Sequence, residues 1–337
     1  MNISEIGKFA LLDRLNAGFV SQQQTTIKPF DDASVIGVSN KLKQVCSDIF
    51  LEGIHFNLVY TPLKHLGYKV VTHAVSNIVA MNSVPQQIMA SVGVSSRFNV
   101  PDVESLYEGI RAACTVYGVD LVGNNLSASL TGMMISITAI GETAEENLCC
   151  RTGAQVNDLV CISGNIGAAY MGLQVLERER RVFESSKVQP RLEGYDYVLQ
   201  KQLRPQARQD MLQTFVDAGV KPTSMTDITD GLASDILHIC KQSETGARIY
   251  LEKIPIASET FAVCEEMNFD AATAALNGGD DFELLFTVPL SEHEKIKSLP
   301  GFEIIGHITE ASQGAYLVTP EGNEIKIKAQ GWTSVAG

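Results

Sequence analysis

Apolar positions in the first half of the chain alternate between a period of two and a period near 3.6 residues. Short segments rich in β-branched residues predict strands: SVIGV, KQVCSDIF, QQIMASVGVS, VDLVG and GMMISITAIGE. The segment LKHLGYKVVTHAVSNIVAMN predicts a helix whose inner face carries Leu66, Val70, His73, Ala74, Asn77, Ile78 and Met81. PDVESLYEGIRAACTVYG, opened by Pro101-Asp102, predicts another helix, and MNISEIGKFALLDRL has an amphipathic helical pattern.

The second half of the chain mixes the same two patterns. We expect helices around 167–180, around 205–218 and after the acidic stretch SMTDITDGLASDI, and strands in ARIYLEKIP, DFELLFTV, FEIIGHIT and AYLVT. The polar segment 181–196 has no clear period and predicts a surface loop. Because both halves alternate helices and strands, we predict an α/β fold with α+β layers in two domains, 1–148 and 149–337.

Composition narrows the choice of partners. The net charge of −13 argues against nucleic-acid binding, which needs a basic surface. No apolar run is long enough for a membrane span, and the N-terminus lacks the pattern of a signal peptide. The seven cysteines show no disulfide or zinc spacing, so we expect a cytoplasmic protein. A chain this acidic can approach an anionic ligand only through cations, main-chain amides or a few basic residues.

Acidic residues recur where predicted elements end, beside Gly, Ser or Thr. They lie in FDDASV (Asp31, Asp32), CSDIFLEGIHF (Asp48, Glu52), TDITDG (Asp227, Asp230) and NGGDDFE (Asp280, Asp281, Glu283). Aspartate is common in caps and turns, which explains any one of them. Several carboxylates meeting in one cleft would instead suit Mg²⁺, which prefers oxygen ligands and shares them with substrate phosphates.

Other ligand-binding patterns are weak. The sequence has neither a P-loop nor a strand-linked GxGxxG motif. SGNIGAAYMG could hold an anion on the free amides of a helix start, although close packing explains its glycines equally well. His55, between Ile54 and Phe56, fits a packed histidine or a functional one, and Trp332 fits a tail anchor or a stacking ring.

Together these segments resemble the thiamine-monophosphate kinase family, part of an aminoimidazole ribonucleotide synthetase-like superfamily. FDDASV, SDIFLEGIHF, LGYKVVTHAVSNIVAMNSVP, RTGAQVNDLVCISGNIGAAYMGL, SMTDITDGLASDI and ALNGGDDFELLFTV occur in the family's order over nearly the whole chain. The resemblance implies a homodimer formed by N-terminal sheets and a C-terminal α/β domain. It implies Mg²⁺-dependent transfer of the γ-phosphoryl group of ATP to thiamine monophosphate, giving thiamine diphosphate.

The resemblance also implies roles for individual residues. Mg²⁺ would be held by Asp31, Ser47, Asp48, Asn77, Asn125, Asp227 and Asp230, with main-chain oxygens near Cys46. ATP would contact Tyr107, Asn124, Asn125, Arg151 and Thr229. Thiamine monophosphate would contact His55, Asp280 and Trp332. Asp227 and Asp230 would be the catalytic residues, because phosphoryl transfer depends mainly on positioning and charge neutralisation.

The sequence departs from the family pattern at several of these positions. The family has aspartate at Asn77 and Asn125 and glycine at Asn124 and Phe30, besides milder changes at Asp280 and Thr229. Each asparagine removes a negative charge worth about 4 kcal/mol against a cation about 4 Å away, before desolvation. Three interpretations remain open: a working kinase, a paralogue with another substrate, and a non-catalytic nucleotide-binding relative.

Overall fold

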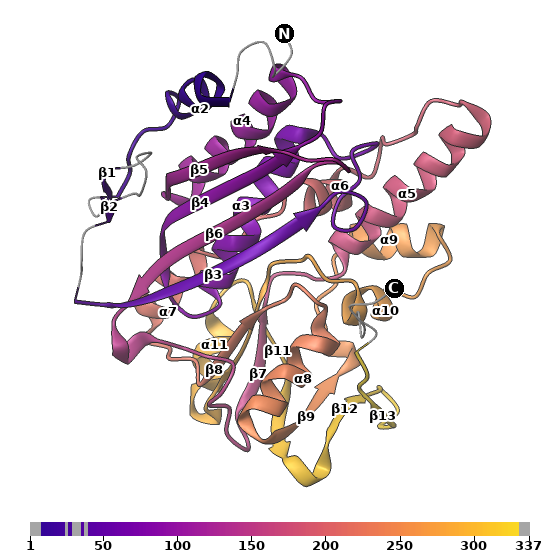
Figure 1. The fold of residues 1–337 in the computed structure, drawn as a ribbon. Coiled ribbons are helices and arrows are strands. Elements are labelled where there is room, and N and C mark those ends of the chain that lie inside the picture. Colours follow the sequence, from indigo (N-terminus) through magenta and orange to yellow (C-terminus); the bar gives the residue numbers. More distant parts are fainter. Residues whose placement is uncertain (1–7, 24–25, 29–34, 37–39, 330–337) are drawn as a thin grey trace. The chain divides into compact units, whose positions relative to one another are not determined.

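The computed structural model describes residues 8–23, 26–28, 35–36 and 40–329. Contacts divide the chain into two units. The first comprises Met1–Val79 and Ser83–Leu148, and the second Ala80–Asn82 and Cys149–Gly337. Each unit combines helices with a β-sheet (Figure 1). The predicted α/β class with α+β layers is therefore confirmed.

The first unit is built on a four-stranded sheet with the strand order β3-β6-β4-β5. Its strands are β3 (Leu42–Leu51), β4 (Val84–Val94), β5 (Asp120–Ala128) and β6 (Met134–Thr143). β6 pairs antiparallel with β3 and β4, whereas β4 and β5 are parallel. α3 (Leu63–Val79) packs on β3, β4 and β6, and α4 (Val100–Tyr117) packs on α3, so helices cover one face of the sheet (Figure 1).

Local sequence signals explain where α4 begins and ends. Asn99 accepts a hydrogen bond from the main-chain N–H of Asp102, and the Asp102 side chain accepts one from the N–H of Asn99. This reciprocal capping box satisfies two amides that have no partner within a helix. Gly118, with φ of 65°, ends the helix in the left-handed conformation that glycine adopts at low cost.

The other face of this sheet exposes apolar side chains. Val45 and Ile49 of β3 are 65% and 51% exposed, and Met134 of β6 is also exposed. Side chains alternate along a strand, so Cys46, Asp48 and Phe50 point to the opposite face, toward α3. The open face therefore carries the surface available for an association, and the covered face carries Asp48.

Short elements flank the sheet. α2 (Lys8–Asn16) contacts β5 and α4, which confirms the helix predicted near the N-terminus for the part that the structure describes. β1 (Thr26–Lys28) pairs antiparallel with β2 (Val35–Ile36), and η1 (Glu145–Asn147) is a single 3₁₀ turn. The buried Asp120 carboxylate accepts hydrogen bonds of 3.0 Å from the Ser21 hydroxyl and the Gln23 amide, which anchors the chain after α2.

The second unit contains a seven-stranded sheet with the order β13-β12-β9-β11-β7-β10-β8. Its strands are β7 (Leu159–Ser163), β8 (Ser224–Asp227), β9 (Thr245–Tyr250), β10 (Leu284–Val288), β11 (Phe302–Glu310), β12 (Ala315–Val318) and β13 (Glu324–Lys326). Neighbours pair antiparallel except for the parallel pair β12–β9.

Helices cover both faces of this sheet. They are α5 (Ala168–Ser186), α6 (Asp196–Leu203), α7 (Asp210–Ala218), α8 (Leu232–Ser243), α9 (Ser258–Glu266), α10 (Ala271–Asn277) and α11 (His293–Ser298), with 3₁₀ turns η2 (Leu251–Lys253), η3 (Leu290–Glu292) and η4 (Ala311–Gln313). The apolar side of α8, including Ile236 and Ile239, packs into a core with strand residues such as Ile249. On the other face, Phe215 of α7 stacks on Phe302 with ring centroids 5.4 Å apart.

Several helices differ from the prediction. The polar segment 181–196 was expected to be a loop, but α5 continues to Ser186. Arg180 forms ion pairs with Glu177 at 2.7 Å and Glu184 at 3.1 Å, and such pairs three and four residues apart extend a helix whose surroundings are polar. α6, α9 and α10 were not predicted because their apolar patterns are short. The helix expected around 205–218 begins only at Asp210.

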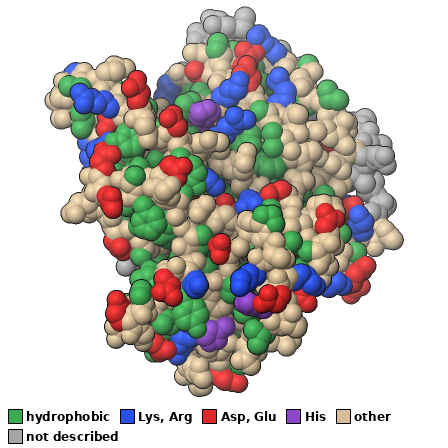
Figure 2. Space-filling view, turned by 180° about the vertical axis from the view of Figure 1, so that it is seen from behind, with side chains coloured by type: hydrophobic (Ala, Val, Ile, Leu, Met, Phe, Trp, Pro, Cys, Tyr) green, Lys and Arg blue, Asp and Glu red, His purple; other side chains and the backbone are tan. Residues whose placement is uncertain are grey.

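Surface charge and helix lengths are the features relevant to nucleic acid and to membranes as partners. Acidic and basic side chains are interspersed over the face shown in Figure 2. In the part of the chain that the structure describes, no helix combines the length and apolar character needed to cross a bilayer.

Candidate active site

Two of the predicted acidic segments run side by side in the second unit. β8 ends at Asp227, and its pairing with β10 continues beyond both strands. The amide of Asp280 donates to the carbonyl of Thr229, and the amide of Phe282 donates to the carbonyl of Ile228, both at 3.0 Å. TDITDG and NGGDDFE are therefore joined by main-chain hydrogen bonds, which places Asp280 beside the segment that carries the predicted metal ligands.

Glycines allow these segments to approach so closely. Gly279 has φ of +74°, and a Cβ atom there would lie 2.4 Å from the carbonyl oxygen of Thr229. Gly231, which precedes α8, has φ of +93°, and a Cβ atom there would lie 2.7 Å from the carbonyl oxygen of Leu276. A side chain at either position would separate the two segments.

Three carboxylates gather around the start of α8. Asp227 and Asp235 are each 1% exposed, whereas Asp230 is exposed to solvent. Among the described residues, Oδ2 of Asp235 is buried without a hydrogen-bond partner. Burial, and then the charges of Asp227 and Asp230, raise the pKa of Asp235 to about 8. Concentrated negative charge with an unsatisfied oxygen attracts a cation such as Mg²⁺, although these three carboxylates are not by themselves arranged as a ligand set for a metal ion.

Arg151 is held next to this acidic group. Its Nε donates to Oγ1 of Thr226 at 3.0 Å, and its main-chain oxygen accepts hydrogen bonds from the hydroxyls of Ser224 and Ser243 at 2.9 and 3.3 Å. Its charge lowers the pKa of Asp235 and so offsets part of the effect of burial. A fixed guanidinium beside an acidic cluster can also contact an anionic ligand.

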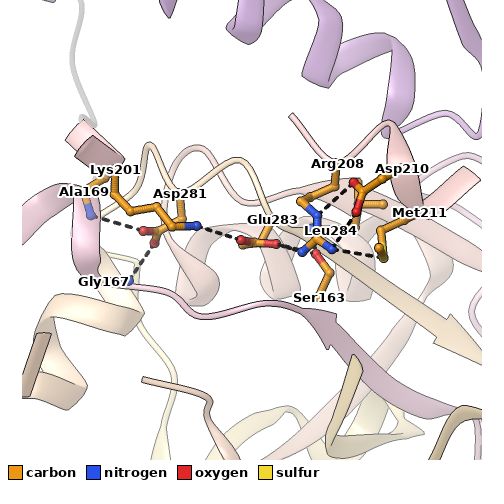
Figure 3. Close-up of polar contacts among 10 residues, drawn as sticks. All are labelled: Ser163, Gly167, Ala169, Lys201, Arg208, Asp210, Met211, Asp281, Glu283 and Leu284. Atoms are coloured by element: carbon orange, nitrogen blue, oxygen red, sulfur yellow. Dashed lines mark hydrogen bonds and ion pairs between the residues drawn. The ribbon is translucent and has the colours of Figure 1, made fainter. Parts of the chain in front are cut away.

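A buried polar network supports the NGGDDFE segment (Figure 3). The carboxylate of Asp281 accepts hydrogen bonds from the amides of Gly167 at 2.8 Å and Ala169 at 3.4 Å, at the start of α5. Burial raises the pKa of Asp281 to about 7, and these two amides oppose that rise. The amides considered as an anion cradle in SGNIGAAYMG are thus occupied by the protein's own carboxylate.

Glu283 ties the same segment to two cations. Lys201 lies 3.1 Å from Oε1 of Glu283 and Arg208 lies 2.6 Å from Oε2, while the hydroxyl of Ser163 donates to Oε2 at 2.7 Å (Figure 3). Glu283 is buried, so these partners supply the charge and hydrogen bonds that water no longer provides. Glu283 therefore fixes β10 and, through it, the position of Asp280.

A second polar group lies between β3 and α3 of the first unit. Nδ2 of Asn77 donates to Oδ2 of Asp48 at 3.1 Å, and Nδ1 of His73 lies 3.6 Å from the same oxygen. His73 and Asn77 are four residues apart on α3 and therefore share one face of the helix. The side chains of Asp48 and His73 are 22% and 23% exposed, whereas the Nδ1 atom of His73 is itself buried.

Aromatic contacts connect this group to His55. The Phe50 ring meets His73 edge-on at 5.2 Å between centroids and His55 at 6.0 Å. Nδ1 of His55 accepts a hydrogen bond from the amide of Leu51 at 3.0 Å. The proton of the neutral imidazole must then be on Nε2, on the exposed side of the ring, where it can be donated to an anionic ligand.

The remaining predicted residues of the first unit lie apart from Asp48. The hydroxyl of Ser47 is 3.0 Å from that of Thr138, on the opposite face of the sheet. Asn125 is exposed on the edge strand β5, and the β6 and β4 strands separate it from β3. Three strand spacings of about 4.8 Å place β3 and β5 roughly 14 Å apart within one chain.

Two of the three residues predicted to contact ATP in this unit, Asn124 and Tyr107, are held within the unit itself. The side-chain amide of Asn124 donates to Oδ1 of Asn16. Tyr107 is fully buried in α4, and its hydroxyl has no hydrogen-bond partner among the described residues. Burial raises the pKa of Tyr107, so its hydroxyl stays protonated. Any contact of Tyr107 with a nucleotide would require its hydroxyl to become accessible.

Other predictions fall outside the described residues. Asp31, Phe30 and Trp332 belong to that part of the chain. Within the described ranges, no group of three or more His, Cys, Asp or Glu side chains is arranged to hold a metal ion. The structure thus brings the predicted metal ligands together as Asp227 with Asp230 in the second unit and as Asp48 with Asn77 in the first.

Comparisons with known proteins identify the family. The model of the AIR synthase related protein, N-terminal domain, matches residues 30–143, and that of the C-terminal domain matches residues 155–324. The thiamine-monophosphate kinase of Aquifex aeolicus is 30% identical over 335 residues, covering 98% of this chain and 99% of the relative. The chain belongs to the thiamine-monophosphate kinase family. The family resemblance predicted from the sequence is therefore confirmed.

Further members of the thiamine-monophosphate kinase family agree in length and fold. The Bacillus subtilis enzyme is 26% identical over 332 residues, covering 96% of this chain and 98% of its own. The solved structure of AaThiL complexed with AMPPCP and TMP is 29% identical, covers 98% of both chains and gives a TM-score of 0.75. The likeness to thiamine-monophosphate kinases thus extends over both units.

Two polar residues of this family member received no ligand-binding role from the family resemblance. Asp235 lies within the acidic stretch SMTDITDGLASDI, and His73 lies in the predicted helix. Each occupies a position on the apolar side of its helix, beside Ile236 in α8 and Ala74 in α3. A polar residue at an apolar helical position is the signal that could have singled them out.

Proposed function

We propose that this chain transfers the γ-phosphoryl group of ATP to the phosphate of thiamine monophosphate, producing thiamine diphosphate. The observation that carries this proposal is the full-length likeness to thiamine-monophosphate kinases, one of which was solved with AMPPCP and TMP. The side-by-side arrangement of TDITDG and NGGDDFE supports it, because the predicted metal ligands and the predicted acceptor-binding residue Asp280 lie on neighbouring segments.

We assign the Mg²⁺ ions to the acidic side chains. Asp227 and Asp230, with Asp31, would hold them, and the crowded carboxylates around Asp235 favour a cation there. Bound Mg²⁺ neutralises phosphate charge, which lets two anionic substrates approach each other. Arg151 and Thr229, next to these aspartates, would contact ATP together with Tyr107, Asn124 and Asn125. Asp227 and Asp230 act by positioning charge, and the reaction needs no separate general base.

The acceptor would be bound by His55, Asp280 and Trp332. The Nε2–H of His55 is directed away from the hydrogen bond made by its other ring nitrogen, so it can donate to a phosphate oxygen. Asp280 has φ of +58°, and its amide is fixed to Thr229. This hydrogen bond places the main chain of Asp280 beside the segment that carries Asp230.

We also propose a homodimer formed through the open face of the first unit's sheet. Val45, Ile49 and Met134 expose apolar surface there, and contiguous apolar surface of this kind marks association sites. Sedimentation at micromolar concentration should give a mass near twice that of the 36.5 kDa chain. A monomer under these conditions would contradict the dimer.

Direct assay tests the activity. The chain is incubated with Mg²⁺, ATP and thiamine monophosphate, and thiamine diphosphate is measured by chromatography. Asp230→Asn should abolish the product while leaving the melting temperature within a few degrees, because Asp230 is exposed. The control, Asp196→Asn, replaces an exposed aspartate in the first turn of α6 and should retain activity. A fully active Asp230→Asn variant would show that Asp230 has only a structural role before α8.

The asparagines at positions 77 and 125 favour one alternative, a non-catalytic nucleotide-binding relative. In that case the assay yields no thiamine diphosphate, although ATP still raises the melting temperature in a metal-independent way. A kinase requires both product and a thermal response that depends on Mg²⁺.

A further inference from the structure

We propose that Asp48, His73 and Asn77 form a binding site in the first unit for a divalent transition-metal ion, such as Mn²⁺, Co²⁺ or Zn²⁺, in preference to Mg²⁺. Oδ2 of Asp48 lies 3.1 Å from the Asn77 amide and 3.6 Å from Nδ1 of His73. Ligand atoms about 2.1 Å from a metal are roughly 3.0–3.4 Å from one another. The pairs Asp48–Asn77 and Asp48–His73 already have nearly this spacing.

The donor atoms decide which ion suits the site. A half-turn of the Asn77 amide exchanges Nδ2 for Oδ1, so the set becomes one carboxylate oxygen, one amide oxygen and one imidazole nitrogen. Mg²⁺ prefers oxygen ligands and strict octahedral geometry, whereas imidazole suits transition metals. With a single carboxylate, the site also has little charge to draw Mg²⁺ from water. The nitrogen of His73 therefore shifts the preference away from Mg²⁺.

The surrounding fold holds these ligands in place. α3 presents His73 and Asn77 from successive turns, and β3 presents Asp48 opposite them. The Phe50 ring lies against His73 at 5.2 Å and an interplanar angle of 88°, which limits rotation of the imidazole. Partial exposure of the Asp48 side chain gives an ion a path from solvent toward Nδ1 of His73, which is itself buried.

The catalytic consequence of this metal site rests on the proposed kinase function. A kinase with an oxygen site at Asp227 and Asp230 and a mixed nitrogen–oxygen site at Asp48 would use two metals of different preference. Metal binding itself is measured without ATP or acceptor, so it does not depend on catalysis.

The test is a titration of the full, nucleotide-free chain with Mn²⁺, followed by electron paramagnetic resonance in millimolar Mg²⁺. We expect one Mn²⁺ to remain bound. His73→Gln, which replaces the nitrogen donor by an amide, should weaken Mn²⁺ binding by at least about tenfold. The matched control is His65→Gln on the same helix, two turns before His73, which should bind as the unaltered chain does. A double variant, Asp227→Asn with Asp230→Asn, should also keep this Mn²⁺.

X-ray absorption of the Zn²⁺- or Co²⁺-loaded unaltered chain gives a second measurement that needs no variant. It should show imidazole in the coordination shell. An all-oxygen shell, displacement of Mn²⁺ by millimolar Mg²⁺, or equal Mn²⁺ affinity in a folded His73→Gln variant would each overturn the inference. Kinase activity without this Mn²⁺ site would refute the inference alone, and a Mn²⁺ site without kinase activity would refute the proposed function alone.

Discussion

Replacing Asp235 by asparagine should change how the stability of the protein depends on pH. The unfolded chain releases the proton of an aspartate near pH 3.9, whereas the folded chain retains the proton of Asp235 up to about pH 8. Between these values the folded state binds one more proton than the unfolded state. The free energy of unfolding should therefore fall by about 1.4 kcal/mol for each pH unit on account of this one group.

The causes lie in the structure. Asp235 is 1% exposed, one of its oxygens is buried without a hydrogen-bond partner among the described residues, and Asp227 and Asp230 repel its charge. Asparagine keeps the shape but does not titrate. Between pH 5 and pH 7 the stability of Asp235→Asn relative to the unaltered chain should thus rise by about 3 kcal/mol.

Urea unfolding of both proteins at pH 5, 6 and 7, without metal or nucleotide, measures this difference. Groups that do not interact with Asp235 titrate alike in both proteins, so their contributions cancel. Asp196→Asn, an exposed aspartate in the first turn of α6, separates the effect of burial from that of removing any aspartate. A difference that stays constant with pH, or that shrinks as pH rises, would refute the reasoning.

Two further substitutions probe the close approach of the acidic segments and the missing charges. At Gly279, φ is +74° and a Cβ atom would lie 2.4 Å from the carbonyl oxygen of Thr229. In Gly279→Ala, urea unfolding should therefore show a free energy of unfolding lower by about 2 kcal/mol or more. Mg²⁺ and ATP should also raise the melting temperature of this variant less than that of the unaltered chain. Gly194→Ala controls for backbone strain, because Gly194 has φ of +88° but open space around it. An equal loss of stability in Gly194→Ala would show that the contact with Thr229 is not the cause. Asn77→Asp combined with Asn125→Asp should tighten binding of Mg²⁺ and ATP by at least about tenfold in calorimetry, because each restores a negative charge. Unchanged or weaker binding would show that the asparagines are not what limits the cations.

The sequence predicted the elements with long, regular apolar patterns. α3 and α4 have such patterns, and α4 also has a capping box and a terminal glycine. It did not predict α6, α9 and α10, whose short sequences gain their helical state from packing against one another and α5. The end of α5 was missed because a solvated helix held by ion pairs shows no apolar period.

For the candidate site, the sequence identified the segments involved, but it did not predict the contacts between them. It singled out TDITDG and NGGDDFE separately, but their hydrogen-bonded alignment depends on the order of strands in the sheet, which local patterns do not encode. The internal use of the α5 amides by Asp281 was likewise hidden, since 114 residues of sequence separate Asp281 from Gly167. Family resemblance supplied residue roles that physical reasoning from single segments left open.

The main-chain hydrogen bonds that join TDITDG to NGGDDFE couple the positions of the two acidic segments. A cation that draws TDITDG into a tighter arrangement must also reposition the loop at Asp280, and an acceptor gripped at Asp280 must act back on the cation ligands. Thermodynamic linkage requires that such an influence be equal in both directions. We therefore expect cation and acceptor to promote each other's binding by the same factor, so that neither substrate phosphate is held firmly until both are present.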